Sequence, residues 1–423
     1  MLDLKLIRSD PERVKAALAR RGAAEPLDEL LALDARRREL LPRIEGAQAE
    51  RKTISKQIGE AKQRGEDAGE QMAAVAELKQ AIEAGKAELE QVDADLQRVA
   101  TALPNLPDPD APEGMTEDDA VVLREEGELP SFDFEPRDHL EIGSEHDLID
   151  MEAGARVSGS RFAYIKGDLV LLELALVRFA LDLVREEGHE PVVPPVLVRE
   201  EALIGTGFLP GDRDQIYEVP KDELFLVGTS EVPLAALHAD EILAAEQLPI
   251  RYAGFSPCFR REAGAGGRDT RGIFRVHQFD KVEMFSFVEP SKSAEEHERL
   301  LAIEERILAE LEIPYRVVNV AAGDLGAPAA KKYDCEAWIP SQGRYRELTS
   351  CSNTTDYQAR RLACRYRPND DEAPAPVHTL NGTAVAVGRT MIALIENRQE
   401  REGGFTLPTI LHSYGAPERI GTP

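Results

Sequence analysis

A long run of helix-forming residues near the N-terminus constrains the fold more than any other feature. From Leu27 to Leu103 the chain is dominated by Ala, Glu, Gln, Lys, Arg and Leu. In the second half, a seam recurs at alternating spacings of three and four, which is typical of a coiled coil. The seam positions are Val75, Leu78, Ile82, Gly85, Leu89, Val92, Leu96, Val99 and Leu103. A poorer series precedes it at Leu33, Leu40, Ile44, Ala47, Ile54, Ile58 and Ala61.

The segment Arg64–Gly69 separates these two halves and has the composition of a turn. We therefore expect an antiparallel coiled-coil hairpin, with two helices of about 35 residues and about 50 Å each. Pro42 interrupts the first half, because proline inside a helix removes a hydrogen bond. A bend or a helix start is expected there.

The two halves of the hairpin carry opposite charge. Residues 36–64 contain nine Lys or Arg and four Asp or Glu, whereas residues 66–98 contain three and nine. One interpretation is that opposite charges pair between the helices. The other is that the basic half contacts an RNA backbone, and the two are compatible. The candidate RNA contacts are Arg36, Arg37, Arg38, Arg43, Arg51, Lys52, Lys56, Lys62 and Arg64.

The rest of the chain has a different organisation. A proline-rich exit at Leu103–Gly114 leads into the acidic, aperiodic stretch Met115–Pro136, which is predicted to be a linker. Beyond it, helix-like and strand-like stretches alternate, which favours an α+β domain on an antiparallel sheet flanked by helices. The expected domains are residues 1–110, a linker over 111–135, and residues 136–423.

Composition excludes several classes of protein. A chain of 423 residues with 42% apolar residues can build at least one large core. No apolar run approaches the roughly 18 residues that span a bilayer, and the N-terminus lacks the layout of a signal peptide, so a cytoplasmic protein without membrane contact is expected. The four cysteines form no Cys-x-x-Cys pair, so neither zinc nor disulfides are expected. The net charge of −27 means that any nucleic-acid contact must be local.

One segment combines arginines, glycines and carboxylates as a nucleotide site would. Cys258–Glu262 reads as the end of a strand, a glycine-broken basic loop follows, and Arg271–Glu283 reads as the returning strand. Arginine forks match phosphate oxygens in a bidentate way, and carboxylates such as Glu262 and Glu283 can hold an amino group. This arrangement suggests a bound polyphosphate.

This segment, within residues 251–288, resembles motif 2 of the class II aminoacyl-tRNA synthetases, and its amino-acid sequence is similar to that of the seryl enzymes. The stretch Leu380–Arg398, within residues 380–399, resembles their motif 3. A helix and a proline-ended strand over residues 169–194 resemble the less specific motif 1, which forms a dimer interface in the family. The similarity extends from Met1 to the C-terminal Leu407–Leu411.

The resemblance implies roles for particular residues. Arg260, Arg389 and Glu347 would be catalytic, with Glu347 and Ser350 holding Mg²⁺. ATP would be bound by Arg260, Arg261, Glu262, Arg275, Val276, Phe279, Glu347, Leu348, Thr349, Ser350 and Arg389. L-serine would be bound by Thr229, Ser230, Glu231, Arg260, Glu283, Asn381 and Thr383; the family more often has alanine in place of Ser230. No histidine is assigned to catalysis, because the reaction needs charge stabilisation rather than a base.

The resemblance also implies an activity. The chain would activate serine with ATP and Mg²⁺, then load it onto tRNA(Ser), and also onto the selenocysteine tRNA, tRNA(Sec), as a homodimer. The hairpin would recognise a long variable arm by its shape. Two alternatives remain open: a ligase that loads an amino acid onto a carrier protein, and a non-catalytic coiled-coil RNA-binding paralogue. The hairpin argues against the first, and Arg260, Glu347 and Arg389 argue against the second. The signature sequences of class I synthetases and P-loop enzymes are missing.

Overall fold

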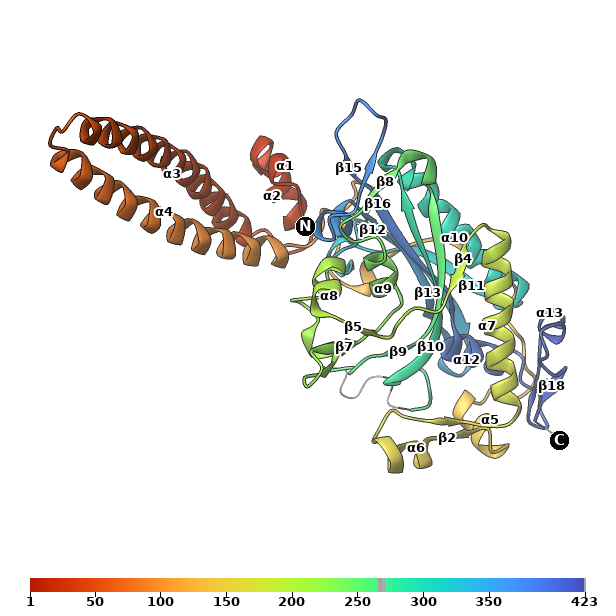
Figure 1. The fold of residues 1–423 in the computed structure, drawn as a ribbon. Coiled ribbons are helices and arrows are strands. Elements are labelled where there is room, and N and C mark those ends of the chain that lie inside the picture. Colours follow the sequence, from red (N-terminus) through yellow and green to blue (C-terminus); the bar gives the residue numbers. More distant parts are fainter. Residues whose placement is uncertain (265–268, 270, 422–423) are drawn as a thin grey trace. The chain divides into compact units, whose positions relative to one another are not determined.

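The computed structural model describes residues 1–264, 269 and 271–421, and these form two compact units (Figure 1). The smaller unit comprises Leu2–Ala19 and Ala23–Leu103. The larger unit comprises Met1, Arg20–Gly22 and the chain from Pro104 onward. Within the described residues, no helix is long and apolar enough to cross a membrane.

The smaller unit is built from four helices. They are α1 (Leu4–Ser9), α2 (Pro11–Ala19), α3 (Pro26–Gln63) and α4 (Gly69–Ala102). Helices α3 and α4 lie side by side as a hairpin, which confirms the predicted coiled-coil arm (Figure 1). At 1.5 Å per residue they are about 57 and 51 Å long.

Helix α3 runs through Pro42 without interruption, so the predicted helix start at this position is wrong. Pro42 lies on the exposed side of the helix, where water can satisfy the carbonyl group of Arg38 that loses its partner. On the opposite side, Leu40 and Ile44 are buried against Val92 of α4. Packing across the hairpin therefore holds the helix together at a position where local propensity opposes it.

Close packing and ion pairs join the two helices of the hairpin. A Cβ atom at Gly85 would lie 2.9 Å from Cγ1 of Ile44, so glycine allows the helices to approach here. Arg36 and Arg43 contact Glu88, Arg37 contacts Asp93, and Arg98 contacts Glu29. The predicted pairing of opposite charges between the helices is thus observed. Because these pairs are exposed to solvent, they contribute little to stability.

An eight-stranded sheet forms the centre of the larger unit, in the order β1-β11-β12-β13-β16-β10-β9-β4. All neighbouring strands are antiparallel except β4 and β9. The strands are β1 (Val121–Glu126), β4 (Glu190–Val192), β9 (Ile250–Phe259), β10 (Gln278–Val288), β11 (Tyr315–Asn319), β12 (Lys331–Ile339), β13 (Arg344–Thr355) and β16 (His378–Ala386). Strand β1 falls inside the segment 111–135 that was expected to be a linker.

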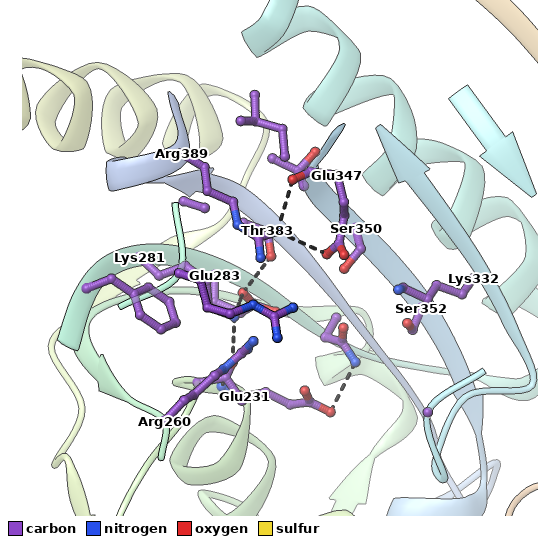
Figure 2. A pocket seen from close by; sticks show the side chains of 18 of the residues that line it. Glu231, Arg260, Lys281, Glu283, Lys332, Glu347, Ser350, Ser352, Thr383 and Arg389 are labelled. Carbon is purple, nitrogen blue, oxygen red and sulfur yellow. Dashed lines mark hydrogen bonds and ion pairs between the residues drawn. The ribbon is translucent and has the colours of Figure 1, made fainter. Parts of the chain in front are cut away.

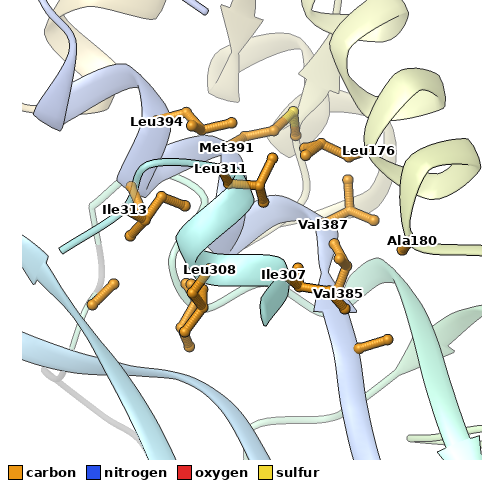
Figure 3. Close-up of a cluster of buried hydrophobic side chains, with 14 of the residues drawn as sticks. Leu176, Ala180, Ile307, Leu308, Leu311, Ile313, Val385, Val387, Met391 and Leu394 are labelled. Atoms are coloured by element: carbon orange, nitrogen blue, oxygen red, sulfur yellow. The ribbon is translucent and has the colours of Figure 1, made fainter. Parts of the chain in front are cut away.

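Three helices cover the core face of this sheet: α7 (Asp168–Glu186), α10 (Ser293–Glu310) and α12 (Val387–Asn397). Figure 3 shows Leu176 of α7, Ile307 of α10 and Met391 of α12 converging in one apolar cluster. Each such fully buried side chain contributes about 1.5 to 3 kcal/mol through the hydrophobic effect. The mixed α+β class predicted from the sequence is confirmed.

Shorter elements complete the larger unit. The helices are α5 (His139–Glu145), α6 (Met151–Ser158), α8 (Glu200–Thr206), α9 (Glu231–Ala236), α11 (Tyr357–Arg361) and α13 (Thr409–His412), and the strands are β2 (Ile149–Asp150), β3 (Tyr164–Ile165), β5 (Leu197–Val198), β6 (Tyr217–Val219), β7 (Leu224–Leu226), β8 (Ile242–Ala244), β14 (Arg365–Arg367), β15 (Ala375–Pro376), β17 (Phe405–Thr406) and β18 (Arg419–Ile420). The four cysteines are buried and free.

Strand alternation separates the core from the opposite face of the sheet. On β10, Val282 and Met284 join the apolar cluster, while Lys281 and Glu283 line a cavity. Successive side chains of a strand point to opposite faces, so two charged residues two positions apart emerge on the same side. The polar face of the sheet is therefore where the site is formed.

Candidate active site

A cavity of about 380 Å³ opens on the polar face of the sheet, and charged side chains from distant segments point into it (Figure 2). It is bounded by strands β10, β13 and β16, by the start of α12, and by the loop Gly326–Ala329, called the pocket wall below. The predicted site residues that line it are Thr229, Glu231, Arg260, Glu262, Arg275, Val276, Phe279, Glu283, Glu347, Leu348, Thr349, Ser350, Asn381, Thr383 and Arg389.

Two of the residues that were predicted to bind serine or ATP do not line the cavity. Ser230 is fully buried, and its hydroxyl group donates to the carbonyl oxygen of Gly254 at 3.2 Å. The side chain of Arg261 is exposed, and its backbone N–H donates to the carbonyl oxygen of Gln215. Each lies between two lining residues, Ser230 between Thr229 and Glu231 and Arg261 between Arg260 and Glu262, so the cavity is lined by their neighbours instead.

Arg260 extends into the cavity from the end of β9. Its backbone N–H donates to the carbonyl oxygen of His277 at 3.0 Å, and its Nε donates to that of Gly228 at 3.2 Å. Its guanidinium carbon lies 5.3 Å from the ring centre of Phe279, within the range of a cation–π contact. The imidazole of His277 in turn contacts the carbonyl oxygen of Arg260 at 2.9 Å, consistent with a structural role for this histidine.

A cluster of carboxylates and donors forms one end of the cavity. Oε2 of Glu283 accepts from Nζ of Lys281 at 2.6 Å and from the hydroxyl group of Thr383 at 3.1 Å. Lys281 also donates to the hydroxyl oxygen of Thr229 at 2.8 Å. Glu231 accepts from the amide of Asn381 at 3.1 Å. Burial and the nearby charge of Glu283 raise the pKa of Glu231 to about 7.

Arg389 marks the other end, at the start of α12. It donates to the carbonyl oxygen of Glu347 at 2.9 Å, and its Nη1 lies 3.5 Å from Oε1 of the same residue. The ring of Phe274 lies 4.9 Å from its guanidinium carbon and 4.1 Å from that of Arg346. Asp269 binds Arg346 through two hydrogen bonds. These contacts hold Arg389 and the rim of the cavity in a fixed arrangement.

Glu347 has a strongly lowered pKa. Burial acts to raise its pKa, but the charges of Lys332, Arg389 and Arg260 outweigh burial and lower the pKa to about 2. The carboxylate therefore stays ionised, and Ser350 and Ser352 on the same strand line the same cavity. Oxygen ligands of this kind suit Mg²⁺, which is usually bound by one or two carboxylates together with substrate phosphates. Among the described residues, no group of three or more His, Cys, Asp or Glu is arranged to hold a metal.

A buried histidine anchors the return of the arginine-rich segment. Nε2 of His139 accepts from the backbone N–H of Ile273 at 3.2 Å, so Nδ1 carries the proton and donates to Oε1 of Glu396 at 2.9 Å. Gly272 has φ of +70°, and a Cβ atom there would lie 2.0 Å from Nε2 of His139. The glycine in this position is thus required by both conformation and space.

Several lining residues were not predicted from the sequence. They are Phe208, Asp212, Ile273, Phe274, Lys281, Gly326, Ala327, Pro328, Ala329, Lys332, Ser352, Ala386 and Gly388. Lys281 precedes Glu283 by two positions, and strand alternation places both side chains on one face. The two-residue spacing of Lys281 and Glu283 was therefore visible in the sequence. The pocket wall has no comparable sequence pattern, because its residues are small and aperiodic.

Models of two protein families match the chain. The Seryl-tRNA synthetase N-terminal domain matches residues 1–107, and the class II tRNA synthetase core domain (G, H, P, S and T) matches residues 216–398. The Serine--tRNA ligase of Streptomyces coelicolor is 50% identical over 418 residues, which is 98% of this chain and 97% of the relative. The chain belongs to the serine–tRNA ligase family. The Serine--tRNA ligase of Acidothermus cellulolyticus is 51% identical, again over 98% of both chains.

Solved structures agree with this assignment. Seryl-tRNA synthetase from Pyrococcus horikoshii, complexed with ATP, superposes with a TM-score of 0.95 at 42% identity and covers 100% of both chains. The cytoplasmic Serine-tRNA ligase of Naegleria fowleri, in complex with AMP, has a TM-score of 0.88 at 32% identity, covering 99% of this chain and 98% of that one. The class II synthetase fold with its N-terminal helical arm is thereby confirmed, as is the family predicted from the motifs.

Proposed function

We propose that this chain is a serine–tRNA ligase that converts L-serine and ATP to seryl-adenylate and diphosphate, and then transfers the seryl group to the 3′ end of tRNA(Ser). The observation that carries the proposal is the meeting of Arg260, Arg389 and Glu347 on one cavity, next to the cluster of Thr229, Glu283 and Thr383. Cations for a triphosphate and polar groups for a small amino acid thus lie in the same space.

Arg260 aligns the reactants of the first step. A carboxylate oxygen of serine attacks the α-phosphorus of ATP, a P–O bond forms, and the bond to the bridging oxygen of diphosphate breaks. The step needs no protein nucleophile, so the site accelerates it by alignment and by neutralising charge. A guanidinium can bind the serine carboxylate and the α-phosphate together through its separate N–H groups. Its fixed backbone contacts hold it ready for this role.

ATP lies along the Phe279 and Arg389 side of the cavity in this proposal. Phe279 stacks on one face of the adenine and Arg389 covers the other while reaching the γ-phosphate. Glu262 accepts from the adenine amino group, and Arg275 binds a terminal phosphate. Glu262 and Arg275 lie 3.4 Å apart, so this assignment requires a bent ATP whose terminal phosphate folds back towards the adenine. Arg261, Val276, Leu348 and Thr349 complete the proposed ATP site.

Glu347 and Ser350 would hold Mg²⁺, which supplies charge neutralisation at the phosphates when bound. The low pKa of Glu347 supports this assignment, because the carboxylate is ionised at every pH at which the enzyme would work. Arg389 keeps Glu347 in place through contacts to its carbonyl oxygen and its side chain.

The carboxylate cluster selects serine. Glu231 and Glu283 bind the ammonium group and the hydroxymethyl side chain together with Thr229, Asn381 and Thr383, and Ser230 supports the turn beneath them. An alanine in this site would leave buried polar groups unpaired, and the extra methyl group of threonine would meet the walls. Selectivity therefore follows from hydrogen bonding and size.

The hairpin binds tRNA through its basic helix. Arg36, Arg37, Arg43, Lys56 and Arg64 are engaged in ion pairs with acidic neighbours that they can exchange for phosphates. Among the described residues, Arg51, Lys52 and Lys62 make no ion pair, and we infer that these contact the RNA backbone first. We further propose that tRNA(Sec) is a second substrate, that the enzyme is a homodimer, and that it acts in the cytoplasm.

An ATP–pyrophosphate exchange assay with each of the standard amino acids tests the proposal. Serine is expected to be the sole strong substrate, with threonine and alanine weaker by about 100-fold or more because of the pocket's size and unpaired donors. Aminoacylation of tRNA(Ser) is then measured with the same preparation. Exchange with serine but without tRNA charging would favour a carrier-protein ligase, and absence of exchange would rule out the proposed activity.

A further inference from the structure

A buried glutamine behind the serine end of the cavity makes three hydrogen bonds through one amide group. Nε2 of Gln358 donates to Oε1 of Glu231 at 2.7 Å and to the carbonyl oxygen of Thr206 at 3.2 Å. Its Oε1 accepts from the hydroxyl group of Thr379 at 2.9 Å. The hydroxyl group of Thr354 lies 3.3 Å from this oxygen but has a closer acceptor in the carbonyl oxygen of Thr379, at 2.7 Å. Gln358, Thr354 and Thr379 are completely buried, and none of the three was predicted to belong to the site.

We propose that Gln358 is a positioning residue for amino-acid selection, fixing the orientation of the Glu231 carboxylate. This inference rests on the proposed serine site and deepens it. Gln358 does not line the cavity, so it acts through Glu231 and does not touch the substrate.

The amide of Gln358 can adopt only one orientation. Turning it over would set its oxygen against Oε1 of Glu231 and against the carbonyl oxygen of Thr206, which are both acceptors. The hydroxyl group of Thr379 holds the amide oxygen on the other side. Thr354 and Thr379 also contact each other, their hydroxyl oxygens 2.6 Å apart. A donor fixed in this way keeps Glu231 in one rotamer before any substrate binds, which lowers the cost of binding.

The same network reaches the pocket wall through Asn105. Nδ2 of Asn105 donates to the carbonyl oxygens of Thr354 at 2.8 Å and Pro328 at 2.9 Å. Arg21 holds the wall as well, by donating to the carbonyl oxygens of Gly326 and Ala329 at 2.8 and 3.0 Å. One set of hydrogen bonds, buried at Thr354 and partly exposed at the wall, therefore connects the Glu231 carboxylate with the pocket wall.

The network lies on the serine side of the site. Glu231 shares its Oε1 between Gln358 and Asn381, whereas the proposed adenine contacts, Phe279 and Arg389, take no part in it. A change at Gln358 should therefore raise the KM for serine and leave the KM for ATP nearly unchanged. If Gln358 only stabilised the fold, its replacement would change the KM values for both substrates or for neither.

The charges around Glu231 predict a distinctive pH dependence. Glu283, Lys281 and Arg260 face it from β10 and from the end of β9. In the wild type, the serine KM rises as the pH falls below about 7, because Glu231 takes up a proton and loses its attraction for the ammonium group. In Gln358→Glu, the new carboxyl can replace the amide donor only while it is protonated. Near Glu231 the two carboxyls share a proton, which is lost as the pH rises.

The experiment compares full-length Gln358→Met and Gln358→Glu with the wild type. KM and kcat for serine and for ATP are measured by pyrophosphate exchange between about pH 6 and about pH 9, with thermal unfolding alongside. Asn319→Asp is the matched control, because it also converts a buried amide to an acid but lies on β11, outside the cavity. It should alter thermal stability and leave both KM values unchanged.

Gln358→Met is expected to raise the serine KM about 10- to 100-fold at every pH, since a hydrogen bond to a buried charge is lost. For Gln358→Glu, the ratio of variant to wild-type serine KM should be close to one at the acidic end and should increase with pH. If Gln358→Met fails to fold, the isosteric Gln358→Glu carries the test through the increase of this ratio from the acidic to the alkaline end of the range. Unchanged serine KM values, or equal increases for serine and ATP, would overturn the inference. A wild type without serine-dependent exchange would refute the proposed function instead.

Discussion

Replacing Arg260 with lysine is expected to reduce kcat/KM for serine-dependent pyrophosphate exchange by about 100- to 1000-fold. Lysine keeps the charge but cannot bind the carboxylate and the α-phosphate with separate, rigidly placed N–H groups. It would also lose the hydrogen bond from Nε to the carbonyl oxygen of Gly228 and the contact with the Phe279 ring. The loss should fall mainly on kcat, because alignment of the reacting atoms matters most in the transition state.

The control for this change is Arg306→Lys. Arg306 lies on α10, on the core side of the sheet, and pairs with Glu310 at the surface. Its replacement should leave exchange unchanged. If Arg260→Lys retained wild-type kcat with both substrates, Arg260 could not be the group that brings the carboxylate and the α-phosphate together.

Shortening the hairpin should separate the two steps of the reaction. Removing residues 45–84 and joining the helices with a short glycine-rich turn keeps the base of the hairpin, because Ile44 and Gly85 face each other across it. Serine-dependent exchange should stay within about twofold of the wild type, since no residue of the hairpin lines the cavity. Aminoacylation of tRNA(Ser) should fall by about 100-fold or more, because several phosphate contacts would be lost.

Charge substitutions in the intact hairpin provide the matched comparison. Changing Arg51, Lys52 and Lys62 to glutamine should weaken tRNA binding and reduce its dependence on salt concentration. Changing Glu70, Glu77 and Glu90 of α4 to glutamine alters as many charges but should not weaken binding. Full aminoacylation by the shortened enzyme, or equal effects of the two triple variants, would show that the basic helix does not contact tRNA.

The sequence predicted the parts of the fold that have local signals. The spacing of Val75, Ile82 and Leu96 indicated the hairpin, because a heptad repeat depends only on the residues within one helix. The strand β1 was not recognised, since all its residues are exposed and it therefore shows no alternation of burial. Its place in the sheet depends on pairing with β11, which is distant in sequence. The sequence left a bend or a helix start open at Pro42, and the helix start was wrong because packing against α4 overrides local propensity.

The residues of the candidate site were likewise predictable only where they lie in a recognisable sequence motif. The arginine-rich segment and the stretch beginning at Leu380 were recognisable as motifs, and the structure brings most of their predicted residues to one cavity. Lys332 and Gln358 were not predicted, because neither lies in these motifs. Gln358 is 127 residues from Glu231, and a single glutamine in a sequence gives no sign of the carboxylate that it will meet. Only the folded chain, in which α8 packs against both α9 and α11, brings them together.

A crystal structure with a non-hydrolysable sulfamoyl analogue of seryl-adenylate would test the central claim most directly. The account predicts that the adenine lies between Phe279 and Arg389. Arg260 should contact the seryl carbonyl oxygen and a sulfonyl oxygen of the sulfamoyl group. The seryl ammonium and hydroxyl groups should lie within hydrogen-bond distance of the cluster formed by Thr229, Glu231, Glu283 and Thr383. An analogue bound elsewhere, or bound in this cavity with its seryl group directed away from that cluster, would contradict it.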